Sequence, residues 1–201
     1  MISEAPSLSD EALARQTQAG SMEAFEELVS RYERRVYAFI SQSCRNGMDA
    51  AEITQEAFVK AYQAISQFDP KRTFAPWLFT IARRKCVDHF RAMRPASDES
   101  PPELSDTNNP AELLAVEDER RQLWNLARRI LPQTQFEAIW LHYVEDMNLA
   151  EVAKVLGRPQ TYIKVLLFRA RKTLAERLKP TRANTHSLSQ TMPHVYEIPV
   201  R

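Results

Sequence analysis

The sequence predicts an all-α protein of two small helical domains joined by an acidic linker. Apolar residues recur at helical spacing along most of the chain. The 201 residues include only 3 glycines and few runs of β-branched residues, which disfavours sheets. Residues 96–119 hold 8 acidic residues and no Lys or Arg, which separates the two helical parts. With 44% hydrophobic residues, the chain has enough apolar material for one core or two small ones.

Charge is unevenly distributed along the chain, although the net charge is only +1. Residues 1–95 carry 13 basic and 12 acidic residues, whereas residues 120–201 carry 14 and 6. The linker is therefore at −8 and the C-terminal part at +8. A basic module behind an acidic spacer indicates a polyanionic ligand.

Two helices are predicted at the N-terminus. Ser9 and Asp10 are both candidates to cap a short helix over residues 11–19, which Gly20 ends. Ser21 then caps a long core helix that we expect to end near Gly47. Its apolar positions keep helical spacing for about five turns and are Phe25, Leu28, Val29, Tyr32, Val36, Phe39 and Ile40.

The next helix, over residues 49–65, combines an apolar face with an acidic one. Asp49, Glu52 and Glu56 share the acidic face, and Phe58 falls among the outward positions. Single exposed apolar residues are common on protein surfaces, but an aromatic residue beside carboxylates suggests a docking surface. The predicted inward or partly inward positions are Ile53, Ala57, Val59, Tyr62 and Ile65.

A charged loop over residues 67–73 leads into a helix over residues 74–93. The helix has an exposed basic strip of Arg83, Arg84, Lys85 and Arg91, and aromatic residues lie among the cations. Basic side chains track phosphates and aromatic rings stack on unpaired bases, so this region is a candidate site for single-stranded nucleic acid. A core helix with a solvated basic face remains an equal alternative. The predicted core positions are Phe74, Trp77, Leu78, Ile81, Ala82 and Phe90.

Domain boundaries follow from composition. Residues 94–111 are rich in Pro, Ser, Asp and Asn, without helical periodicity, and a helix over residues 112–130 follows. We divide the chain into a first domain at 1–95, a linker at 96–119, a second domain at 120–179 and a tail at 180–201. The tail loses its apolar period, and we expect it to be disordered.

Residues 131–178 have the pattern of a helix-turn-helix. A first helix carries an apolar face of Phe136, Ile139, Trp140, Tyr143 and Val144. Asn148 is an N-cap with a box-like partner, Glu151, at the start of a short second helix, and Gly157 ends that helix. Pro159 suits the first turn of a third helix, whose expected inward positions are Ile163, Leu167, Ala170, Leu174 and Leu178. Such a pair of helices is often ordinary packing, but the basic residues of the last helix favour DNA binding.

Catalysis is not predicted, and we assign no catalytic residue, metal site or cofactor. Cys86 and His89 are three residues apart, but further ligands at suitable spacing are missing. The sequence contains no evident catalytic triad and no glycine-rich phosphate loop. Cys44 and Cys86 lie outside any CxxC motif, which favours a reducing compartment while leaving a single bridge open. Without a signal-peptide pattern or an apolar run long enough to span a membrane, we expect a cytoplasmic protein with no membrane insertion.

Four segments together resemble a known family. They are DAAEITQEAFVKAYQAI from residue 49, FAPWLFTIARRKCVDHFR from residue 74, Leu131 with Pro132, and LAEVAKVLGRPQTYIKVLLFRARKTL from residue 149. In this order they are similar to the extracytoplasmic-function (ECF) group of bacterial RNA polymerase sigma factors in the sigma-70 family. The resemblance covers about residues 9–179 and implies a region-two domain, a linker and a region-four domain.

The resemblance implies partners and site residues. Region two would bind the clamp helices of the largest subunit of core RNA polymerase, with the flap as a further contact of the factor. Region two would also recognise and help melt the minus-ten element as single strands, and region four would bind the duplex minus-thirty-five element. An anti-sigma factor is a further candidate partner. The implied residues are Asp49, Glu52, Gln55, Glu56 and Phe58 for polymerase, Phe68, Lys71, Arg72, Phe74, Arg83, Arg84 and Lys85 for the minus-ten element, and Lys164, Val165, Phe168, Arg169 and Arg171 for the minus-thirty-five element.

The chain departs from the family pattern at two places. Where relatives usually carry Gly-Thr-Val-Lys-Ser-Arg, residues 161–166 are Thr-Tyr-Ile-Lys-Val-Leu, so Val165 and Leu166 replace polar or basic residues. Leu166 is expected to join the core and Val165 to touch a thymine methyl. Arg84 stands where relatives often have Asn. The promoter sequence therefore does not follow from the resemblance, and a stand-alone helix-turn-helix regulator that binds duplex DNA without polymerase is the alternative.

Overall fold

The computed structural model describes residues 8–44, 47–93 and 115–178, and every regular element in these ranges is a helix. The predicted all-α class is confirmed. The predicted tail and most of the predicted linker lie outside the described residues. In chain order the elements are α1 (Asp10–Gln18), α2 (Met22–Ser41), α3 (Gly47–Ala64), the 3-10 helix η1 (Ile65–Gln67), α4 (Phe74–Met93), α5 (Ala115–Ile130), α6 (Gln133–Tyr143), α7 (Leu149–Leu156) and α8 (Gln160–Leu178).

The helix starts follow the predicted caps, but α2 ends earlier than expected. Ser9 and Ser21 each accept a backbone N–H bond in the first turn of their helix, at 3.2 Å. α2 ends at Ser41, where the hydroxyl of Ser41 and the amide of Gln42 donate to the carbonyl of Ala38 at 2.9 and 3.2 Å. Side-chain donors thus satisfy a carbonyl that a continuing helix would use.

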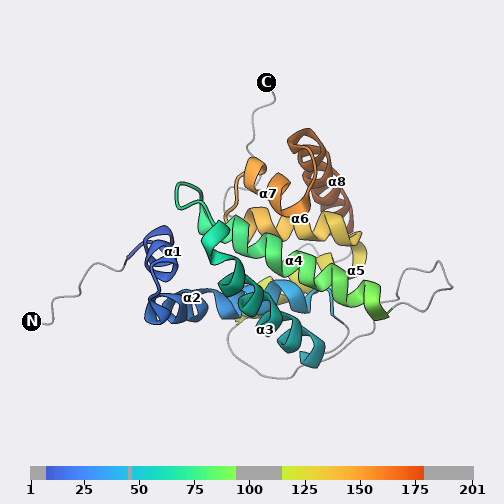
Figure 1. The fold of residues 1–201 in the computed structure, drawn as a ribbon. Coiled ribbons are helices and arrows are strands. Elements are labelled where there is room, and N and C mark those ends of the chain that lie inside the picture. The colour runs from blue at the N-terminus through green and yellow to red at the C-terminus, as the bar shows by residue number, and fades with distance from the viewer. Residues whose placement is uncertain (1–7, 45–46, 94–114, 179–201) are drawn as a thin grey trace, which may run out of the picture.

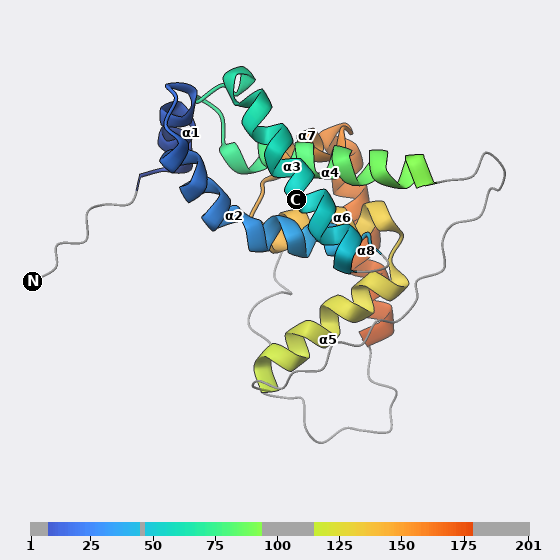
Figure 2. The same cartoon turned by 60° about the horizontal axis from the view of Figure 1, so that its bottom comes forward.

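The N-terminal half, residues 8–93, is a bundle in which α3 packs against α2 and α4 (Figures 1 and 2). Some of its aromatic residues meet edge to face, such as Phe39 of α2 and Phe79 of α4, whose ring centroids are 5.4 Å apart. This geometry adds to plain area burial in a core. The largest fully buried side chains of this half are Leu28, Val36, Ile40, Ile53, Phe74, Leu78 and Phe79.

The orientation of α3 differs from the prediction. Phe58, expected to point outward, is 7% exposed, whereas Val59 and Tyr62, expected inward, are 53% and 40% exposed. Because α3 has neighbours on two sides, its buried arc is wider than one apolar stripe and includes Phe58 beside Ala57. The prediction from the sequence assumed a single apolar stripe, and it placed Val59 inside and Phe58 outside, the reverse of what the structure shows.

The C-terminal half, residues 115–178, packs α6, α7 and α8 around one apolar core, with α5 against α6 and α8. Ile163, Leu167 and Ala170 of α8 are buried as predicted, and Leu166 joins them. Tyr143 and Leu178 were expected inside but are exposed, because both lie at the end of their helix.

The two halves pack directly on each other. α4 of the N-terminal half lies beside α7 of the C-terminal half (Figure 1). Polar side chains also join them: the guanidinium of Arg128 donates to the backbone carbonyl of Cys44 at 2.9 Å, and Gln133 donates to the hydroxyl of Ser43 at 2.5 Å. The described part of the chain is therefore one packed arrangement of both halves.

Burial predicts opposite outcomes for two neighbours in α3. Phe58→Ala should lower the free energy of unfolding by about 3–5 kcal/mol, because it removes a buried aromatic ring. Val59→Ala, at an exposed position, should change it by about 0.5 kcal/mol or less. Urea denaturation of the full chain measures both values, and equal losses would contradict the orientation of α3.

Candidate functional site

The polar residues of the predicted docking face of α3 lie at the surface, but its aromatic residue, Phe58, does not. Glu52, Gln55 and Glu56 are exposed and Asp49 is half-buried. The carboxylate of Glu56 accepts from the ammonium of Lys85 on α4 at 3.1 Å, so a predicted polymerase contact and a predicted DNA contact are paired. Phe58 is in the core rather than on this face.

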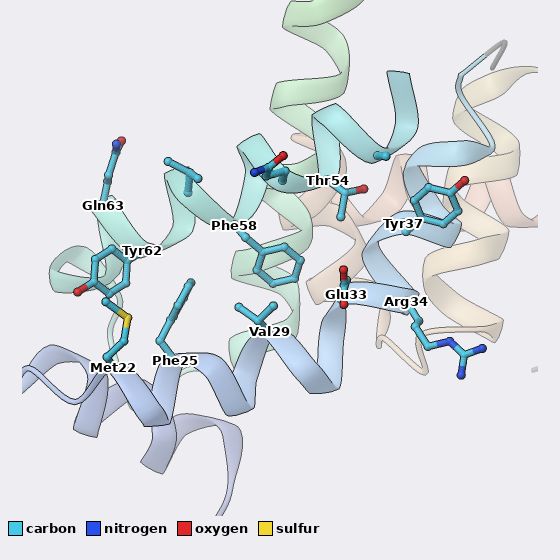
Figure 3. Close-up of a pocket in the computed structure, with 13 residues that line it drawn as sticks. Met22, Phe25, Val29, Glu33, Arg34, Tyr37, Thr54, Phe58, Tyr62 and Gln63 are labelled. Carbon is cyan, nitrogen blue, oxygen red and sulfur yellow. The ribbon is translucent and has the colours of Figure 1, made fainter. Parts of the chain in front are cut away.

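A groove that the sequence reasoning missed lies between α2 and α3 (Figure 3). It has a volume of about 1070 Å³, and Phe58 forms part of its floor. Exposed Met22 of α2 and exposed Val59 and Tyr62 of α3 are on its walls. The helical spacing of Phe25, Val29, Val59 and Tyr62 was visible in the sequence, but it was read as core packing, and Phe58 was placed on the outward side. The remaining lining residues are Phe25, Val29, Glu33, Arg34, Tyr37, Ala51, Thr54, Gln55 and Gln63.

The predicted DNA-binding loop has buried aromatic ends. Phe68 and Phe74 are buried, and both pack against Trp77 with ring centroids 5.2 and 5.5 Å away. Gln18 of α1 donates from its amide to the carbonyl of Phe68 at 2.7 Å, which anchors the start of the loop. The burial of Phe74 matches its predicted core position, and neither Phe68 nor Phe74 exposes a ring face to a base in this arrangement.

The exposed part of the loop carries cations. The Asp69 carboxylate accepts the backbone N–H of Lys71 at 3.0 Å, which is a local turn. Lys71 and Arg72 are exposed, and Arg72 forms a loose ion pair with Asp69 at 3.4 Å. A pair this exposed contributes little to stability and leaves both cations accessible to an anion.

The basic strip of α4 is only partly free. Arg84 is exposed, as expected. Arg83 was expected to be exposed but is half-buried, and its Nε donates to the carboxylate of Glu137 on α6 at 2.9 Å. Glu137 was not singled out from the sequence, because a carboxylate in an apolar helix gives no sign of a partner 54 residues away.

The helix-turn-helix has the local structure that the sequence predicted. Asn148 and Glu151 form a reciprocal capping box at the start of α7, and Gly157 adopts the left-handed conformation at φ 62° that ends it. α8 then presents exposed Lys164, Val165, Phe168 and Arg169, with Phe168 64% exposed. Arg171 is half-buried and donates to the carbonyl of Leu167 at 3.2 Å, so its side chain lies along its own helix.

The cysteines of the described residues are buried free thiols. The hydrogen bond to Cys86, and then burial, raise the pKa of Cys44, so this thiol stays protonated at neutral pH. The described residues contain no group of three or more His, Cys, Asp or Glu side chains able to hold a metal ion. None of the helices described is long and apolar enough to cross a membrane.

Family models match both halves of the chain. The model for Sigma-70 region 2 matches residues 28–95, and the model for Sigma-70, region 4 matches residues 128–174. The ECF RNA polymerase sigma factor BldN of Streptomyces coelicolor is 34% identical over 171 residues, which are 83% of this chain and 64% of BldN. The ECF RNA polymerase sigma-E factor of Escherichia coli is 30% identical over 185 residues, which are 86% of this chain and 96% of sigma-E.

Solved structures share the fold. CnrH, in complex with the cytosolic domain of CnrY, matches with a TM-score of 0.61 and 27% identity over 84% of this chain and 96% of that chain. The sigma factor RpoE of Bartonella quintana, in complex with the anti-sigma factor NepR, matches with a TM-score of 0.68 over 80% of this chain and 100% of that chain. At 24% identity, the second match supports the fold alone. The chain therefore belongs to the ECF group of the sigma-70 family, RNA polymerase sigma factors that direct the polymerase to promoters and are not enzymes.

Proposed function

We propose that this chain binds core RNA polymerase through α3, binds the melted minus-ten element with α4 and the loop before it, and binds the minus-thirty-five duplex with α8. The domains for these roles are residues 1–95 and 120–179, with residues 96–119 as the linker and 180–201 as the tail. The observation that carries the proposal is the acidic and apolar surface of α3. This surface belongs to the N-terminal half, whereas the recognition helix α8 belongs to the C-terminal half. A stand-alone duplex-binding regulator has no use for such a surface.

The polymerase contact combines charge with apolar area. Asp49, Glu52, Gln55 and Glu56 supply the acidic side. The α2–α3 groove lies beside them, and its exposed Val59 and Tyr62 take the role that the resemblance implied for Phe58. An interface needs a desolvated apolar centre as well as a charged rim, which this combination provides. Phe58 then supports the groove from below.

The proposed minus-ten contact uses cations of the loop and of α4. Buried aromatic rings hold the loop in a fixed shape. Lys71, Arg72 and Arg84 are exposed and suited to phosphates, and Arg83 and Lys85 join them when their carboxylate partners leave. Phe68 and Phe74 hold the loop in shape from inside. Because these two rings are buried, a nucleobase that stacks on this surface must stack on a different, exposed aromatic side chain.

The minus-thirty-five contact uses the exposed face of α8. Lys164 and Arg169 supply hydrogen-bond donors, while Val165 and Phe168 supply apolar contact, for which the thymine methyl is the natural partner in the major groove. Arg171, being half-buried, is placed to orient the helix or to reach a phosphate.

Partners and location follow from the same role. The relatives CnrH and RpoE were solved in complexes, the second with the anti-sigma factor NepR. We propose that an anti-sigma factor also binds this chain, and that the chain acts in the cytoplasm, where RNA polymerase and promoter DNA are. Transcription by polymerase reconstituted with the chain, with start sites mapped across the source genome, tests the activity and yields both promoter elements.

Arg169→Ala should weaken binding to the minus-thirty-five duplex and relax its sequence preference. A bidentate contact between Arg and guanine is worth about 1–3 kcal/mol of discrimination, or roughly 5-fold to 150-fold in affinity. Fluorescence anisotropy with matched and mismatched duplexes measures both effects. Arg177→Ala, at an exposed position in the last turn of α8, is the control and should leave the preference intact. An equal loss on all sequences would instead make Arg169 a phosphate contact.

Val59→Glu should weaken binding of the full chain to core RNA polymerase by about tenfold or more, since it places a charge in the apolar centre of the proposed interface. Surface plasmon resonance with immobilised core enzyme gives the affinity, and circular dichroism checks that the variant is folded. Lys60→Glu is the control, because Lys60 is exposed on the same helix but does not line the groove. Loss of binding in both variants, or in neither, would argue against the groove.

A further inference from the structure

One helix, α1, holds both ends of the loop before α4. The Gln18 amide donates to the backbone carbonyl of Ile65 at 2.8 Å and to that of Phe68 at 2.7 Å, where the loop begins. The Glu11 carboxylate accepts the backbone N–H of Phe74 at 3.2 Å, where the loop ends and α4 starts. α1 also packs against η1 and α4 (Figure 1). Two side chains of α1 therefore fix the loop that we assign to the minus-ten element.

These hydrogen bonds act on the backbone of the loop. Phe74 is the first residue of α4, so its N–H has no acceptor within that helix, and Glu11 supplies one. A carboxylate at this place also interacts favourably with the positive end of the helix dipole. Gln18 bridges two carbonyls three residues apart, and this closes the turn between η1 and the loop. The shape of the loop thus depends on a helix that is distant from it in sequence.

The side chains that hold the loop are separate from those that pack α1 on the bundle. Glu11 and Gln18 are seven residues apart, and two helical turns place them on the same side of α1. Glu11 is half-buried and Gln18 is exposed, whereas Leu13, Ala14 and Thr17 are the buried residues of α1. Removal of either polar side chain should therefore release one end of the loop and leave α1 packed.

α1 is itself fixed to α2. The Asp10 carboxylate accepts from the hydroxyl of Tyr32 at 2.5 Å and from the guanidinium of Arg31 at 2.8 Å. Arg31 also donates to the backbone carbonyl of Leu8 at 2.8 Å. Tyr32 in turn packs edge to face on Phe74, with ring centroids 5.5 Å apart. A hydrogen bond orders a loop only when its other partner is fixed, and these contacts meet that condition.

We propose that α1 holds the loop over residues 68–73 in the shape that binds the minus-ten strand, with Glu11 and Gln18 as positioning residues that do not touch DNA. A loop that is ordered before binding loses less entropy on binding, so Lys71 and Arg72 contact phosphates at a smaller cost. The effect on DNA binding rests on the proposed function; the ordering of the loop by α1 does not.

Gln18→Glu tests the start of the loop, because a carboxylate of the same size cannot donate and faces two carbonyls. Gln16→Glu is the matched control, since Gln16 is exposed and lies about 200° around the helix from Gln18. Limited trypsin digestion of the full chain, read by mass spectrometry, measures cleavage after the exposed Lys71 and Arg72. Cleavage of this kind follows the population in which the segment is open. Two hydrogen bonds correspond to about tenfold in that population, so we expect about tenfold faster cleavage for Gln18→Glu only.

Glu11 tests the end of the loop. Glu11→Ala removes the acceptor of the Phe74 N–H, and we expect cleavage in the loop to become about fivefold faster. Glu11→Gln keeps an acceptor in its amide oxygen and should restore slow cleavage. Cleavage after the exposed Arg84, inside α4, reports on opening of the whole N-terminal half and should be the same in every variant.

DNA binding is measured with core RNA polymerase reconstituted with each variant. The probe is a labelled promoter duplex with an unpaired minus-ten bubble, taken from start sites mapped with the unmodified chain. We expect Gln18→Glu to bind this probe about tenfold more weakly than Gln16→Glu, because the fraction of correctly shaped loops falls. The affinity of the two variants for core polymerase, measured without DNA, should be equal.

The outcomes separate loop positioning from the proposed function. Equal cleavage of the loop in Gln18→Glu and Gln16→Glu overturns loop positioning, and so does equally faster cleavage after Arg84, which would make Gln18 a general stabilising residue. Faster cleavage of the loop with unchanged binding of the bubble overturns the effect on DNA binding. If the unmodified chain yields no promoter, the proposed function fails, and the digestion still decides whether α1 orders the loop. Should circular dichroism find Gln18→Glu unfolded, Gln18→Ala against Gln16→Ala repeats both measurements.

Discussion

Packing of α4 on two sides is the constraint on which the rest of the structure depends. Its apolar face closes the core of the N-terminal half through Phe74, Leu78 and Phe79, and it also lies along α7. Two of its cations, Arg83 and Lys85, form ion pairs with Glu137 and Glu56, whereas Arg84 stays exposed. The state of α4 therefore sets what the protein is able to bind.

Rigidity around the loop comes from aromatic packing. Phe68, Phe74 and Trp77 contact one another, and Gln18 fixes the backbone at two carbonyls, 2.8 Å from that of Ile65 and 2.7 Å from that of Phe68. The loop thus begins and ends on buried rings while its cations point outward. Pre-shaping a loop lowers the entropy lost when a ligand is bound. This fits a protein that binds a flexible single strand better than it fits a passive connection.

The recognition helix combines weak and strong contact types. Val165 and Phe168 are exposed apolar residues on this helix, and they add contact area but little directional specificity. A factor held on polymerase through α3 gains effective concentration at the upstream element, so α8 need not supply all of the binding free energy. Apolar residues on such a helix are tolerable for this reason.

The sequence by itself determined the all-α class, the succession of helices, the capping box of Asn148 and Glu151, the turn at Gly157 and the family. These features depend on local patterns and on residue order, which a sequence contains in full. It did not determine the orientation of α3, the α2–α3 groove or the burial of Phe68, because each depends on which faces meet in the bundle. Only the tertiary structure decided that Glu137 and Glu145 meet Arg83 and Arg35, since these pairs join residues 54 and 110 positions apart and no periodicity records them.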